Sequence, residues 1–127
     1  MLKVKDNHIY ITRGDSGYIT VVPQETTGGS TKDYQLEEGD KIIFRLKARP
    51  EDICSVICEK NCDVNLNTNT ALLRLEPEDT LKCGFREYRY EMELVTHGGF
   101  HSTFIENQSF IVGRELETHD EEPEPFE

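Results

Sequence analysis

The chain has 127 residues, the usual length of a single domain, and it contains no tryptophan. Its 25 acidic residues exceed its 14 basic ones and give a net charge of −11, without a basic stripe that would suit nucleic acid or an anionic membrane. No apolar run has the length of a transmembrane helix, and residues 1–6 lack the apolar stretch of a signal peptide, so we expect cytoplasmic synthesis.

Alternation of apolar and polar residues dominates the chain and predicts β-strands. In chain order the expected strands are 8–12, 18–23, 40–47, 53–58, 70–75, 85–96, 100–105 and 109–112, the last two being compatible with one long, bulged strand. The pattern is clearest in residues 85–96, where one face carries Tyr88, Tyr90, Met92 and Leu94. Such strands have one buried face and one face in water.

Glycine, proline and short polar residues separate these strands. Residues 13–17 are expected to turn between the first two strands, and residues 95–100 to form a tight hairpin around two glycines. Residues 26–33 predict a polar, mobile loop, and residues 77–81 predict one helical turn that begins with Pro77. This turn, followed by a tyrosine-bearing strand, is similar to the tyrosine corner of immunoglobulin-like sandwiches.

About seven short strands, with turns every ~8–12 residues, predict an all-β fold that is either a sandwich or a small barrel. The helical turn at a crossing point favours an immunoglobulin-like β-sandwich of about seven antiparallel strands over residues 1–114. Residues 115–127 are acidic, contain two prolines and are too polar to build a core, so they predict a disordered tail.

The cysteines raise the question of a metal site: they are Cys54, Cys58, Cys62 and Cys83. A structural zinc site usually uses two knuckles of closely spaced Cys or His, and this spacing supplies no second knuckle. Alternation instead places Cys54, Val56 and Cys58 on one strand face, where thiols act as small buried apolar groups. We expect reduced thiols and no cofactor, with a metal protein or an enzyme built on the cysteines as the alternative.

Two short motifs have both a functional and a local reading. His97 and His101 flank the glycine turn and lack a third ligand at a telling spacing, so exposed turn histidines are favoured over a metal site. Arg13-Gly14-Asp15 is the tripeptide that integrins recognise, but these residue types also suit the turn that the strands require. Without a nucleophile elbow, a phosphate-binding loop or a zinc-binding helix, the sequence predicts a non-enzymatic protein with no catalytic residues.

Four stretches carry a resemblance: MLKVKDNHIYITRGDSG (1–17), YQLEEGDKIIF (34–44), LEPEDT (75–80) leading into YRYEMEL (88–94), and GFHSTFI (99–105). Together they resemble small proteins encoded among the tail and baseplate genes of phages and prophages of Gram-positive gut bacteria. They are similar to the immunoglobulin-like N-terminal domain of upper baseplate proteins, which in that family attaches receptor-binding machinery to the virion. The resemblance implies this fold and a virion role, and it assigns no functional residues.

Two classes of function follow as expectations. The first is a non-enzymatic virion structural or assembly protein that contacts tail or baseplate proteins through sheet edges or loops, with self-association as a compatible property. Such a protein would be virion-associated after assembly. The alternative is a module that binds a surface glycan on a concave patch lined by aromatic residues, for which Tyr10, Tyr18 and Tyr34 are the candidates.

Overall fold

The computed structural model describes residues 1–27, 29–48 and 56–114. These residues form strands and one short helix, which are β1 (Leu2–Lys5), β2 (His8–Thr12), β3 (Gly17–Val21), β4 (Gln24–Thr27), β5 (Ser30–Asp33), β6 (Lys41–Lys47), β7 (Val56–Asn61), β8 (Asp63–Asn65), β9 (Thr70–Leu75), α1 (Pro77–Leu81), β10 (Glu87–Val95) and β11 (His101–Gly113). The all-β prediction is confirmed, although the strands outnumber the seven that were expected.

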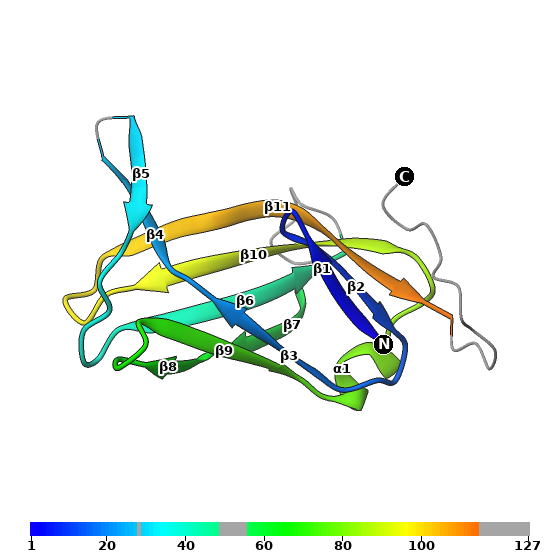
Figure 1. The fold of residues 1–127 in the computed structure, drawn as a ribbon. Coiled ribbons are helices and arrows are strands. Elements are labelled where there is room, and N and C mark those ends of the chain that lie inside the picture. The colour runs from blue at the N-terminus through cyan, green and yellow to red at the C-terminus, as the bar shows by residue number, and fades with distance from the viewer. Residues whose placement is uncertain (28, 49–55, 115–127) are drawn as a thin grey trace.

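The strands form two sheets and a separate hairpin (Figure 1). The larger sheet has the order β1-β2-β11-β10-β6-β7, and its pairs are antiparallel except for β2 with β11, which run parallel. The prediction of antiparallel strands is therefore wrong for this one pair. The smaller sheet has the order β3-β9-β8 with antiparallel pairing. The third unit, β4 with β5, projects from the body at the upper left of Figure 1.

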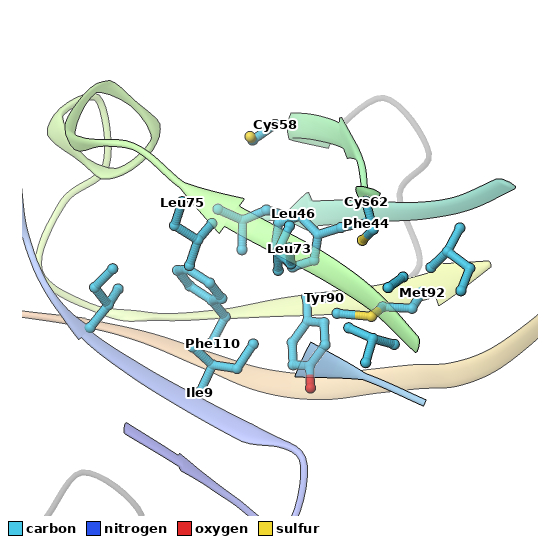
Figure 2. Packing of buried hydrophobic residues seen from close by; sticks show 14 of the residues in the cluster. Ile9, Phe44, Leu46, Cys58, Cys62, Leu73, Leu75, Tyr90, Met92 and Phe110 are labelled. Carbon is cyan, nitrogen blue, oxygen red and sulfur yellow. The ribbon is translucent and has the colours of Figure 1, made fainter. Parts of the chain in front are cut away.

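The alternation seen in the sequence determines which side chains enter the core. On β10 the residues Tyr88, Tyr90, Met92 and Leu94 are buried, as predicted. Phe44 lies between Tyr90 and Phe110, with ring centroids 5.6 Å and 5.9 Å away, and these three rings form the centre of the core (Figure 2). Leu73 and Leu75 of the smaller sheet are buried in the same cluster, so both sheets contribute to one core.

Several predicted elements coincide with observed ones. β2 and β9 have the expected bounds, and the helical turn at residues 77–81 forms α1. Residues 100–105 and 109–112 belong to one strand, β11, as the sequence allowed. Its pairing with β10 shifts register on either side of Met92, and Asn107 has a positive φ of 54°, which together identify the irregularity in this ladder.

Two hairpins were not expected from the sequence. Residues 26–33 were predicted to be a loop, but β4 ends at Thr27 and β5 begins at Ser30, because β-branched threonines favour extended backbone despite their polarity. At the N-terminus, β1 pairs with β2 through a two-residue turn. Its residues Asp6 and Asn7 have φ values of 51° and 67°, as a type I′ turn requires.

The strand predicted at residues 53–58 is described only from Val56 onwards, as β7. A register shift between Leu46 and Lys47 pairs Leu46 with Cys58 and Lys47 with Val56, which leaves Ile57 as an extra residue. Cys58 is therefore buried while Val56 is 36% exposed, so the prediction that they share a face is wrong. Residues 53–55 and the predicted tail at 115–127 lie outside the described residues.

Within the described part of the chain, no helix is long and apolar enough to cross a membrane.

Candidate functional site

The cysteines are the first candidates for chemistry. Cys58, Cys62 and Cys83 are free and buried, and Cys54 lies outside the described residues. Burial raises the pKa of all three described thiols, that of Cys62 to about 12. Because the thiolate is the nucleophile and the metal ligand, such thiols are poorly suited to either role at neutral pH. Among the described residues, no cluster of three or more His, Cys, Asp or Glu is placed to hold a metal ion.

Two of these thiols contact Asp79 of α1, a buried residue. Cys58 Sγ lies 3.7 Å from Asp79 Oδ1, and Cys83 Sγ lies 3.6 Å from the Asp79 main-chain oxygen. Asp79 Oδ2 accepts hydrogen bonds from Lys60 Nζ at 2.5 Å and from the main-chain N–H of Glu76 at 2.7 Å. The second of these belongs to a capping box, so Asp79 satisfies the start of the helix and joins it to β7.

The Arg13-Gly14-Asp15 turn is tied to the other end of the same helix. The Arg13 guanidinium donates to the carbonyl oxygens of Leu81 at 2.6 Å and Cys83 at 3.1 Å, where a cation is favoured by the helix carbonyls. Asp15 forms an ion pair with the N-terminal ammonium group of Met1. Both charged side chains of the tripeptide are engaged within the chain, and this geometry favours the turn reading over an integrin-binding motif.

Tyr88, at the start of β10, completes this end of the molecule. Its hydroxyl accepts a hydrogen bond from the Gly84 N–H at 2.8 Å and lies 3.3 Å from the Gly84 carbonyl oxygen. The chain passes here from β9 of the smaller sheet through α1 to β10 of the larger sheet. We call residues 13–15, α1 and 82–88 the α1 corner. Its polar groups stabilise the connection from β9 through α1 to β10.

At residues 34–40 a second buried carboxylate holds a loop to the β10–β11 turn. Asp40 accepts hydrogen bonds from the Tyr34 hydroxyl at 3.0 Å, from the Glu37 N–H at 2.8 Å and from the His97 N–H at 2.8 Å. Burial alone would raise the pKa of Asp40, but these hydrogen bonds outweigh it and place the pKa below its usual value. Burial and the hydrogen bond to Asp40 raise the pKa of Tyr34 to about 12. We call these four residues the Asp40 knot.

The two predicted turn histidines lie at separate carboxylates. His97 Nδ1 is 3.1 Å from Asp40 Oδ1, and His101 Nδ1 is 2.9 Å from Glu93 Oε2. Their side chains are 53% and 62% exposed, which agrees with the expectation of exposed turn histidines.

Charged residues on the outer face of the larger sheet are paired with one another. Arg45 donates to Glu59 and Glu93 at 2.8 Å and to Glu91 at 3.3 Å, while Lys47 reaches Glu91 at 3.2 Å. Although burial opposes ionisation, hydrogen bonds from His101 and Arg45 place the pKa of Glu93 below its usual value. A general acid at neutral pH would need a raised pKa, so this carboxylate does not suit that role.

The three tyrosines that the glycan alternative relies on do not form an aromatic patch together. Tyr10 is 3% exposed and fills the space beside Gly113, and Tyr34 belongs to the Asp40 knot. Tyr18 is 63% exposed, and the Arg74 guanidinium lies 5.5 Å from its ring centroid.

A groove lies beside β3, lined by apolar residues together with the polar residues Asn7, Thr20 and Gln24, and the sequence did not predict it. It is bounded by Val4 and Asn7 of the first hairpin, by residues 19–21 of β3 with the following Val22, and by Phe104 and Ile105 of β11. The buried side chains of Tyr90 and Met92 line its inner end, and its volume is about 280 Å³. Val4 and Val22 are 48% and 44% exposed, so apolar surface continues onto the rim. We call this feature the β3 groove.

Strand edges without a partner flank this groove. In the described part of the chain, β3 pairs with β9 on one side only, and the pairing of β11 with β2 is limited to residues 110–113 of β11. The earlier residues of β11 are paired with β10 but are not joined in a ladder to β4, which lies nearby. The groove therefore lies where the larger and smaller sheets are both open. No local sequence pattern reports such an opening, because it depends on which distant strands meet.

No protein-family model matches the sequence, and no curated protein is significantly similar to it.

Proposed function

We propose that this chain is a non-enzymatic structural or assembly protein of a phage or prophage virion, which acts by contacting tail or baseplate proteins. In this proposal it is made in the cytoplasm and becomes virion-associated on assembly. The proposal rests on the sequence resemblance, and the observation that carries its mode of action is the edge of β3, which is open among the described strands and lies beside the groove. Buried thiols and mutually paired charges leave protein contact as the function that the geometry supports best.

We also propose that the sandwich is immunoglobulin-like. The larger sheet contains the run β2-β11-β10-β6-β7, and the smaller one contains β3-β9-β8, which is the strand arrangement expected for such a sandwich with an added edge strand. The crossing through α1 to Tyr88, whose hydroxyl bonds back to Gly84, supports the same assignment. On this interpretation β1 and the β4–β5 hairpin are additions to the basic sandwich.

Affinity purification tests the function. The tagged protein is recovered from a lysogenic host after prophage induction, and co-purifying proteins are identified by mass spectrometry, with an uninduced culture as the control. We expect tail or baseplate proteins in the induced sample, and the tagged protein in released particles. Recovery of the protein alone, or with cellular proteins only, would contradict the proposal.

A further inference from the structure

We infer that the β3 groove receives an extended segment of a partner protein, which pairs with the free edge of β3 and inserts apolar side chains into the groove. This inference deepens the proposed function, on which it rests for the existence of a partner. It specifies where contact occurs and what kind of segment makes it.

The free edge of β3 can form main-chain hydrogen bonds with another extended segment. A strand with one neighbour presents unpaired N–H and C=O groups along its other side, and an extended peptide can satisfy them by adding a strand. Among the described strands, β3 has β9 as its single neighbour over residues 17–21. Thr20 is exposed there, and Val22 continues the rim, so a segment can approach this edge without displacing a buried side chain.

The groove itself has room for side chains of such a segment. In an extended segment, alternate side chains point the same way, so those facing the groove would enter it while their neighbours face water. An apolar cavity of roughly 150 Å³ can hold a ring the size of benzene, so the 280 Å³ here suits two aliphatic side chains or one aromatic and one small one. Ile19, Val22 and Phe104 provide apolar walls for them.

Charge identifies the partner as a different protein with a basic character. The chain carries a net charge of −11, which opposes association with a second copy and favours a positively charged segment. Residues 115–127 suit this position poorly, because they hold seven acidic residues and two prolines, and proline cannot donate to a ladder.

The direct test uses peptides. A displayed library of random nine-residue peptides is selected on the full chain, and the enriched peptides are then measured on the Val22→Glu variant, which places a charge at the groove rim. We expect enriched peptides with apolar residues at alternate positions and Lys or Arg near their ends. Their binding should weaken about tenfold or more in Val22→Glu and in Val4→Glu, a second variant from the opposite wall. Leu66→Glu is the matched control, because Leu66 is 43% exposed and lies in the β8–β9 turn.

Hydrogen–deuterium exchange locates the binding. The best enriched peptide should slow exchange of amides within residues 17–21, as strand addition requires. Peptides that bind equally to wild type and Val22→Glu, or that leave these amides unprotected, would overturn the inference. A dimer in sedimentation that Val22→Glu dissociates would also overturn it, because a second copy would then occupy the groove.

The inference and the proposed function fail separately. If wild type and Val22→Glu recover the same tail proteins after prophage induction, the protein is a virion component but the groove is not its docking site. If neither recovers tail proteins while selected peptides still bind at β3, the groove is a peptide site and the virion role is wrong.

Discussion

The α1 corner and the β3 groove lie in the same all-β structure, but they differ in how main-chain groups are satisfied. At the corner, Arg13, Asp79 and Tyr88 satisfy main-chain groups of the crossing segment through their side chains. At the groove, β3 has an open edge among the described strands, and the neighbouring apolar side chains remain partly exposed. The contrast separates polar residues that stabilise the fold from a surface that we propose binds another chain. The predictions below test that separation.

The largest effect is expected at Asp79. Asp79→Ala leaves the Glu76 N–H and the Lys60 ammonium group without their acceptor, so we expect the free energy of unfolding to fall by about 3 kcal/mol in urea titration. The control is Glu78→Ala, which removes an exposed acid from the same helical turn and should cost about 0.5 kcal/mol. Similar losses in both variants would mean that the corner does not depend on this carboxylate.

The Asp40 knot provides a pH-dependent version of the same test. Because folding lowers the pKa of Asp40, its contribution to stability is present above the unfolded value of about 4 and is lost as pH falls through the folded value. Asp40→Asn should cost about 1–2 kcal/mol at pH 7 and should flatten the acid limb of the stability curve. Asp33→Asn, at an exposed position of β5, is the control. Parallel curves for wild type and Asp40→Asn would contradict the role given to this knot.

A smaller effect is expected from one hydroxyl. Tyr88→Phe removes the hydrogen bonds to Gly84 while keeping the buried ring, so we expect a loss of about 1 kcal/mol in thermal or chemical unfolding. Tyr18→Phe removes a hydroxyl from a tyrosine that is 63% exposed and should change stability little. Equal losses of stability in the two variants would mean that the Tyr88 hydroxyl contributes no more to the fold than an exposed hydroxyl does.

The smallest effect on stability is expected at the groove. Val22→Glu should change the free energy of unfolding by no more than about 0.5 kcal/mol, because the side chain is 44% exposed and makes no part of the buried core. Its effect belongs to binding instead. A large destabilisation would show that the groove rim stabilises the fold, as the α1 corner does, and would contradict the difference proposed between the two regions.

The sequence predicted those parts of the fold that depend on local periodicity. β2, β9 and β10 were found because their apolar residues alternate, and α1 because Pro77 begins a helical turn. The β1–β2 hairpin was missed although Asp6 and Asn7 favour its turn, since Leu2 and Val4 are too few to mark a strand alone. The β4–β5 hairpin was missed because its residues are polar.

The candidate site could not be predicted in this way. Val4, Val22 and Phe104 belong to segments far apart in the chain, and they meet only because β2 pairs with the last residues of β11. The roles of Asp40 and Asp79 could not be predicted either, because the sequence does not distinguish a buried aspartate that accepts several hydrogen bonds from a solvent-exposed one. Sequence patterns report the faces of strands, whereas these features depend on how distant segments are arranged.

The parallel pairing of β2 with β11 has a consequence for how the protein folds. Ile9 pairs opposite Phe110, so strands from near the two ends of the described chain lie side by side within the larger sheet. During synthesis β2 has no partner on that side until β11 has left the ribosome. The sheet is therefore completed only once β11 has emerged, and the high sequence separation of this contact favours slow folding, in the millisecond-to-second range typical of roughly comparable all-β proteins.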